Sequence, residues 1–316
     1  MKAGQLSRAL SFGRVRGRIV LVFILLAAPG AAQATRGRLA LSFLAGSGYA
    51  SDVFVGAGLG RDSFFRITPA GRLDLSLAPT WKLAALADVS YGRYVSSEFS
   101  SLSESAALEG RWLAGESWEA SLTASAEHAR YSLAMPLDPT LPSSASVSST
   151  VAGRLAPLLR VRAAGLEWRA AGVAGTRSST SGGARVPEDD GAILAGVMRP
   201  VSESLSVALT YKLERTASER PDFTFTSHAL FGLVAWRLHE IALEAQLQLQ
   251  TAVLGTGMRE ELARFTTSAV YPITDSVAIE GVYAFTANRA DDPTRPSATL
   301  HLAFLAARWR TTAASW

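Results

Sequence analysis

Apolar and polar residues alternate in this chain over stretches that are long for the strands of a soluble sheet. Segment 71–95 (GRLDLSLAPTWKLAALADVSYGRYV) contains two such stretches, separated by a corner at Pro79-Thr80. Before the corner, Leu73, Leu75 and Leu77 alternate with polar side chains. A period of two places successive side chains on opposite faces of an extended strand, so each stretch has one apolar and one polar face.

The same pattern recurs along almost the whole chain after residue 36. It predicts fourteen strands, at 38–47, 62–77, 81–94, 100–113, 117–132, 145–158, 162–177, 190–199, 203–215, 222–236, 240–252, 258–271, 276–288 and 297–310. Each strand with its connection takes roughly 20 residues, whereas soluble sandwiches repeat every 8–12.

The connections between these stretches are alternately short and long. The short set consists of 79–80, 115–116, 160–161, 200–203, 238–239 and 272–275, and the longer polar set of 46–61, 96–99, 136–144, 177–190, 215–222, 254–258 and 288–296. This order is typical of an up-and-down meander with one tight end and one end with long loops. In bacterial outer-membrane barrels the tight end is periplasmic and the long loops are extracellular.

Fourteen apolar stripes have too much area for one soluble core, and a closed barrel in lipid accommodates them. Every backbone group then pairs with a neighbouring strand, and no strand edge remains in hydrocarbon. We therefore predict an all-β fold, a transmembrane antiparallel up-and-down β-barrel of about 14 strands in the bacterial outer membrane. The expected partners are outer-membrane lipid and the barrel-assembly machinery.

The first 34 residues have the order of a secretory signal peptide. Five basic residues precede an apolar run at 19–28, and Ala32-Gln33-Ala34 follows it. We expect two parts, a signal peptide at 1–34 and an outer-membrane barrel at 35–316. The signal holds five of the 31 Lys and Arg and none of the 27 Asp and Glu, which leaves 26 basic against 27 acidic residues. A mature chain of net charge −1 gives no indication of nucleic-acid binding.

The polar face of the strands carries charges of both signs, which we expect to face the lumen. On the lipid side an Arg or Lys costs about 2–4 kcal/mol at the bilayer midplane. A barrel of fourteen strands is wider than the eight-stranded size that side chains fill, so a water-filled lumen is favoured over a packed salt-bridge ladder. The predicted lumen residues are Arg66, Arg72, Asp74, Lys82, Asp88, Glu109, Arg111, Glu119, Glu127, Arg154, Glu167, Arg169, Lys212, Glu214, Glu244, Arg264 and Glu280.

Aromatic residues gather near the two ends of the predicted strands. Amphipathic rings prefer the headgroup level, so two girdles are expected. The tryptophans lie near the short turns or the end of the last strand, and several tyrosines lie toward the long loops. The predicted girdle residues are Trp81, Trp112, Trp118, Trp236, Trp309, Tyr91, Tyr94, Tyr131 and Tyr211.

Catalytic and metal-binding patterns are weak. The chain has no Cys, its four His have no metal-ligand spacing, and it lacks a Gly-x-Ser-x-Gly elbow. The acidic run at 187–190 (PEDD) is expected to be a solvated loop, with divalent-cation binding as the alternative. We expect no enzymatic activity, no cofactor and no metal.

Two segments resemble known families. The final strand, 298–310, with a chain that ends in Trp316, resembles the terminal signal of outer-membrane barrels. Segment 46–75 is similar to the opening of the β-barrel porin family associated with exopolysaccharide export loci. Those members begin with a Gly-Tyr-x-x-Asn-Val hairpin and a Phe-x-Arg-x-x-Pro strand, and the matching positions are Gly48, Tyr49, Asp52, Val53, Phe65, Arg66 and Pro69, with Asp52 in place of Asn.

The function expected from these features is an outer-membrane channel that passes a polar solute. The family resemblance implies that the solute is an exported polysaccharide, with polysaccharide export components as partners. The alternatives are a non-conducting structural or adhesion barrel and an outer-membrane lipid-modifying or proteolytic enzyme. A plug formed by 46–61 or 177–190 would favour the adhesion barrel, and a Ser/His/Asp or paired-carboxylate cluster at one rim would favour the enzyme.

Overall fold

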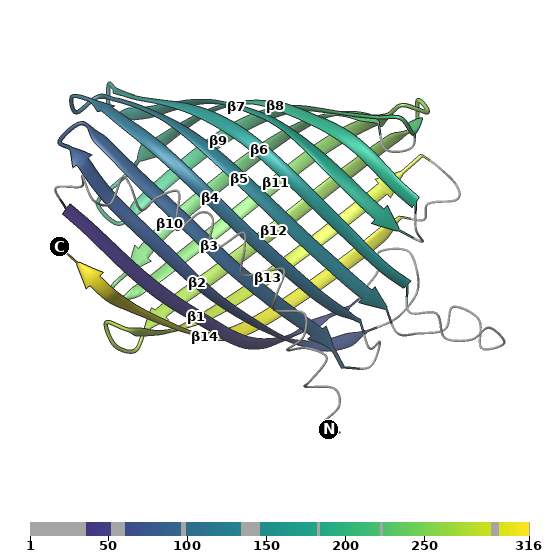
Figure 1. Cartoon of the computed structure of the whole chain (residues 1–316), viewed down its shortest axis with the longest axis horizontal. Helices are drawn as coiled ribbons and strands as arrows, with labels where there is room; N and C mark the ends of the chain where they lie inside the picture. Colours follow the sequence, from purple (N-terminus) through teal and green to yellow (C-terminus); the bar gives the residue numbers. More distant parts are fainter. Residues whose placement is uncertain are drawn as a thin grey trace.

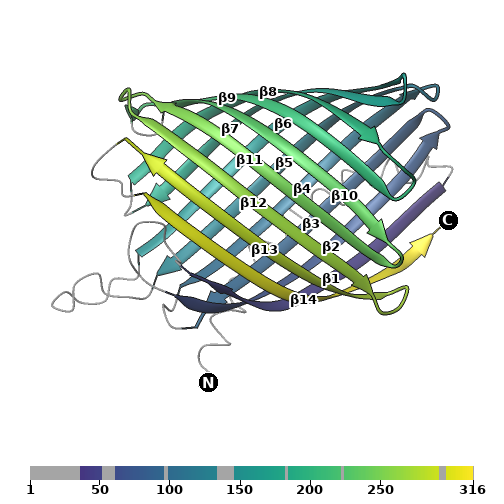
Figure 2. The same cartoon turned by 180° about the vertical axis from the view of Figure 1, so that it is seen from behind.

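In a computed structural model, the chain folds into a closed barrel of fourteen antiparallel strands (Figures 1 and 2). The structure describes residues 36–51, 61–95, 99–133, 146–181, 184–221, 224–291 and 297–315. The strands are β1 (Arg36–Ala50), β2 (Asp62–Ala78), β3 (Trp81–Tyr94), β4 (Ser100–Ala114), β5 (Trp118–Leu133), β6 (Ser146–Ala163), β7 (Leu166–Ser181), β8 (Ala184–Pro200), β9 (Leu205–Ser218), β10 (Phe225–Leu238), β11 (Ile241–Leu254), β12 (Arg259–Pro272), β13 (Val277–Ala290) and β14 (Ala298–Ser315). Among these residues no helix is long and apolar enough to cross a membrane.

Each strand pairs with its neighbour in sequence, and β14 closes the barrel on β1. That seam runs from Arg38 opposite Ser315 to Ala50 opposite Leu302. The register shifts once, between Leu39 and Ala40. An extra residue of this kind lets the last strand change the phase of its side chains. The shift falls beyond Thr312, so Phe304 points inward and Trp309 outward by simple alternation along β14.

The predicted strand number and order are confirmed, and two predicted connections are wrong. Residues 160–161 lie inside β6, and the chain reverses instead at Ala164-Gly165, where both residues have positive φ (52° and 72°). Two successive left-handed residues match the twist of a tight hairpin. Most of 177–190 is strand rather than loop, because β7 continues to Ser181 and β8 begins at Ala184. The ion pair between Arg177 of β7 and Glu188 of β8 holds this extension of the two strands together.

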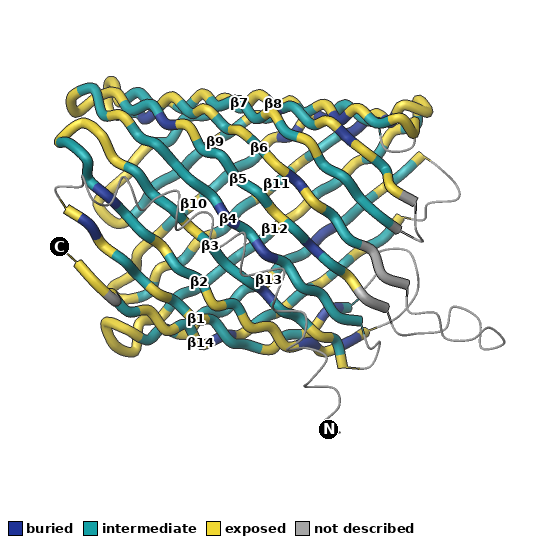
Figure 3. Tube along the Cα trace, in the orientation of Figure 1, coloured by how far each residue is buried: buried dark blue, intermediate teal, exposed yellow. Residues whose placement is uncertain are grey.

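Exposure alternates along the strands, as Figure 3 shows. On β9, Leu209, Tyr211 and Leu213 are exposed, whereas Lys212 and Glu214 between them are partly covered. The polar set is more covered because it points into the concave interior of the closed sheet. Apolar side chains therefore face outward around the barrel, which is the arrangement required for immersion in lipid.

Candidate functional site

The lumen wall is the candidate functional site, and one cavity shows which face it occupies. A cavity of about 610 Å³ is lined together by Ser103 of β4 and Glu280 of β13. In strand order these two strands are separated by β14, β1, β2 and β3, so side chains from both can line one cavity only by pointing into the barrel. Cross-strand register carries this assignment around the wall, since directly paired residues point the same way.

All seventeen residues predicted to line the lumen lie on this inner face. The register links Arg111 to Lys82 on one side and to Ser121 on the other, and it continues through Arg154, Lys212 and Arg264 to Glu280. Arg36, Arg38, Arg160, Arg162, Arg177, Glu188, Asp190, Arg308 and Arg310 also lie on it. Most of these positions lie at or beyond the predicted strand limits. Arg308 lies inside the predicted strand 297–310, in phase with the apolar Leu302 and Phe304.

A chain of ion pairs crosses β4 to β7 near the tight turns. Arg111 lies 3.2 Å from Glu119, and Glu119 lies 3.0 Å from Arg160. Arg160 lies 3.0 Å from Glu167, whose side chain is only 8% exposed and also contacts Arg162 and Arg169 at 3.2 and 2.7 Å. A carboxylate shared by three guanidinium groups is well compensated, so this network fixes the inner wall at the tight-turn end.

A second set of ion pairs lies on β6 to β9, nearer the long loops. Arg154 lies 3.3 Å from Asp190, and Arg177 pairs with the buried Glu188. Lys212 donates a hydrogen bond of 2.8 Å to Glu214 on its own strand. Glu188 and Asp190 belong to the acidic run that the sequence assigned to a loop. Within the described residues no group of three His, Cys, Asp or Glu could hold a metal ion.

Five aromatic rings form a continuous row on the inner wall from β14 across the seam to β5, close to the long loops. They are Phe304 of β14, Phe64 of β2, Tyr94 of β3, Phe99 just before β4, and Tyr131 of β5, with successive ring centroids 5.8, 5.2, 5.5 and 6.1 Å apart. Phe64 is almost fully buried and forms the base of the row. Phe304, Tyr94 and Tyr131 line the cavity. The sequence assigned Tyr94 and Tyr131 to the girdle by their distance from a loop, although their phase along the strand places them inside.

Polar groups share that cavity with the rings. Arg66 donates a 2.7 Å hydrogen bond to Ser90, and Arg308 pairs with Glu280. Arg310 also lines the cavity. Three guanidinium groups and one carboxylate line this part of the lumen, which therefore carries a net positive charge. The wall therefore offers rings for stacking beside donors suited to anionic groups.

The remaining predicted girdle residues lie on the outer face. Trp81, Trp112, Trp118, Trp236 and Trp309 are all exposed and lie toward the tight turns, as does Trp168, which the sequence reading missed. The rings of Trp81 and Trp112 are 6.5 Å apart. Tyr91 lies outside on the long-loop half of β3, and Tyr211 lies outside near the middle of β9. Trp316 and the matched residues Asp52 and Val53 lie outside the described residues.

Three histidines lie on the outer face, away from the lumen. The ring of His228 is 2.6 Å from the hydroxyl of Tyr211, and that of His301 is 2.8 Å from the hydroxyl of Tyr283. His128 lies 3.5 Å from Glu104. His239 occupies the tight turn after β10 and has a positive φ of 55°. Each of the first three therefore has a polar partner on the lipid side of the wall.

These features define the class of the protein, an outer-membrane β-barrel with a channel-like architecture. Among solved structures, the chain is similar to outer-membrane OmpT of Vibrio cholerae, with 8% identity over 87% of this chain and 98% of that chain and a TM-score of 0.53. It is also similar to a mutant of the TodX monoaromatic hydrocarbon channel, with 12% identity over 88% and 91% of the two chains and a TM-score of 0.51. No family model and no curated protein sequence matches the chain. At these identities the likeness shows the fold.

Proposed function

We propose that this barrel is a passive outer-membrane channel for a polar solute, and that the solute is an exported polysaccharide. The observation that carries the channel proposal is the wall itself, where charges of both signs face a cavity of about 610 Å³. Such a wall hydrates a polar solute and guides it. The resemblance at 46–75 and the aromatic row both favour a saccharide as the solute.

The aromatic row supports a saccharide because sugar rings have an apolar face. The C–H groups of that face stack on the negative face of an aromatic ring, while the hydroxyl groups need polar partners. Tyr94, Phe304 and Tyr131 supply rings, and Arg66 and Arg310 supply donors in the same cavity. The excess of arginine favours a saccharide that carries carboxylate groups.

We also propose that the protein acts without catalysis. Support comes from the histidines, three of which face outward with Tyr or Glu partners. Residues 177–181 and 184–190 lie in the wall rather than across the lumen, so this segment does not provide the plug that an adhesion barrel would need. Residues 52–60 lie outside the described residues. Polysaccharide export components at the tight-turn end, and the barrel-assembly machinery during insertion, are the partners that we propose.

Planar-bilayer recording tests the channel proposal. The purified mature protein should conduct ions, and acidic oligosaccharides added to either side should interrupt the current. A folded, inserted protein that passes neither ions nor sugars would reject the channel.

Single substitutions test the saccharide. Tyr94→Ala should weaken the block of current by an acidic oligosaccharide about tenfold, because one stacking ring is lost. The matched control is Tyr91→Ala, which removes a ring from the outer face of the same strand and should leave the block unchanged. Equal block in the two variants, in a channel that still conducts, would reject saccharide stacking and leave the channel in place.

A further inference from the structure

Charged side chains on the outer face of the barrel are gathered at one end. Register and phase place six arginines there, each within the four strand residues nearest a long-loop connection: Arg93, Arg130, Arg185, Arg215, Arg259 and Arg289. His128, His228 and His301 lie on the same half of the outer face. Among the described strand residues the outward acidic groups are Glu104, Asp189 and Glu261, so this arginine belt is positive.

The opposite end of the outer face has a different chemistry. Six tryptophans ring it, and among the described strand residues the outward charge there is Arg199 of β8. Tryptophan suits either interface, whereas an arginine on the lipid face costs several kcal/mol at the midplane and about 0–1 kcal/mol near the headgroups. The arginine belt must therefore lie at headgroup level, in the leaflet next to the long loops.

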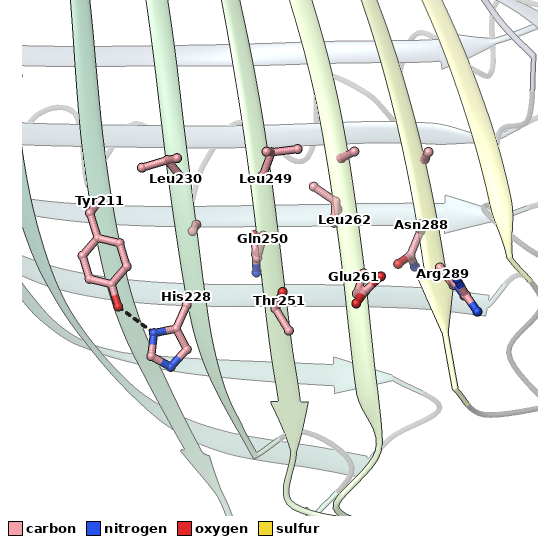
Figure 4. Close-up of a pocket in the computed structure, with 13 residues that line it drawn as sticks. Tyr211, His228, Leu230, Leu249, Gln250, Thr251, Glu261, Leu262, Asn288 and Arg289 are labelled. Atoms are coloured by element: carbon pink, nitrogen blue, oxygen red, sulfur yellow. Dashed lines mark hydrogen bonds between the residues drawn. The ribbon is translucent and has the colours of Figure 1, made fainter.

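A groove of about 440 Å³ on β9 to β13 shows how a lipid could fit against this belt (Figure 4). Leu230 and Leu249 form its apolar part, toward the middle of the barrel. His228, Glu261 and Arg289 form its polar part, next to the strand ends, where His228 is held by Tyr211. Glu261 lies opposite Arg289 in the β12–β13 register. The groove thus has an apolar half and a polar half in the order of a lipid tail and its headgroup.

We propose that the arginine belt and this groove bind the phosphate groups of the glycolipid that forms the outer leaflet of Gram-negative outer membranes. Guanidinium groups bind phosphate in bidentate geometry and are present on six strands around the barrel. The groove takes one acyl chain against Leu230 and Leu249, with a phosphate near His228 and Arg289. We expect glycolipid rather than phospholipid at this site, because the long loops are extracellular and the belt next to them therefore lies in the outer, glycolipid leaflet. The proposal is independent of transport.

Lipid retention measured by native mass spectrometry tests the proposal. The refolded mature barrel should retain a diphosphorylated, acylated glucosamine disaccharide more than its dephosphorylated form and more than phosphatidylglycerol. The double variant R259Q/R289Q should lower that retention about tenfold. R199Q, which removes the outward charge at the tryptophan end, is the matched control and should retain the glycolipid like the unaltered protein. Heat-modifiable gel migration would confirm that each variant is folded.

Three results would overturn the proposal. Equal retention of the phosphorylated and dephosphorylated glycolipids would remove phosphate as the ligand. Equal retention of phosphatidylglycerol would reduce the belt to a general anionic-lipid surface. An equal loss in R199Q and R259Q/R289Q would show that position on the barrel does not matter. Because the readout is retained lipid, failure here leaves the conductance tests unaffected.

Discussion

The rings of Phe64 and Phe304 stack across Gly48, with centroids 5.8 Å apart and planes only 5° from parallel. Gly48 lies between them in register, opposite Phe64 on β2 and Phe304 on β14. A Cβ atom at this position would lie 2.6 Å from the ring of Phe64 and would also clash with the carbonyl oxygen of Ala303. The glycine thus provides the space in which the base of the aromatic row is packed.

Gly48→Ala should destabilise the barrel. One added methyl group must displace backbone as well as a ring, and overpacking of this kind costs about 1–3 kcal/mol. Urea unfolding in lipid vesicles, followed by tryptophan fluorescence, measures the change. Gly153→Ala is the control, because no atom lies within 4 Å of its added Cβ. A loss of stability as large in the control would show that backbone freedom, rather than ring packing, is responsible.

Glu167→Gln should also destabilise the barrel, by roughly 3 kcal/mol, because it leaves three guanidinium groups around a neutral side chain. Asp74→Asn removes a comparable carboxylate from Arg72, but that pair is 42–49% exposed and should cost less than about 1 kcal/mol. The same unfolding assay compares the two. If both variants lose equal stability, the buried network does not fix the wall.

Ion selectivity should depend on the arginines of the cavity. Arg66, Arg308 and Arg310 outnumber Glu280 there, so the channel should prefer anions. Arg310→Ala should shift the reversal potential in a salt gradient toward cation preference. Arg289→Ala, on the outer face, should leave it unchanged. A reversal potential that is insensitive to Arg310→Ala would place the ion path elsewhere.

Two neighbouring residues of β11 test which face contacts lipid. Leu247 is 46% exposed on the outer face, and Gln248 points inward and donates a 2.8 Å hydrogen bond to Gln250. Leu247→Arg should destabilise the barrel in vesicles by about 2–4 kcal/mol, the cost of an arginine near the midplane. Gln248→Arg should cost much less, since the new charge meets water. A larger loss of stability in Gln248→Arg than in Leu247→Arg would contradict the assignment of the two faces.

Much of the fold was predictable because successive side chains of a strand point to opposite faces, and because lipid on the outer face requires apolar residues at every second position. The phase of Lys212 and Glu214 against Leu213 is enough to assign their faces. The limits of β7 and β8 were less predictable. Segment 177–190 is rich in Ser, Gly and acidic residues and reads as a loop, yet Arg177 pairs with Glu188 across the hairpin and extends both strands. Local composition does not record a cross-strand partner.

The aromatic row escaped prediction for a related reason. Phe64 is in phase with Arg66 and turns inward by alternation, but only the strand register shows which rings of other strands lie beside it. Phe99 and Tyr94 become neighbours because a loop returns the chain, with the amide of Tyr94 donating to the carbonyl oxygen of Phe99. Phe304 reaches Phe64 only when the barrel closes. The contacts of Phe64 with Phe304 and Tyr94, and of Phe99 with Tyr131, join residues far apart in the sequence, and no local pattern marks them.

Closure itself sets the order of events during biogenesis. Because β1 pairs with β14, the first strand to emerge from a ribosome waits for the last before its outer hydrogen bonds can form. Until then both strands present open edges that invite pairing with other chains. Such separation in sequence makes folding slow, and the newly exported polypeptide therefore needs protection until its two ends meet.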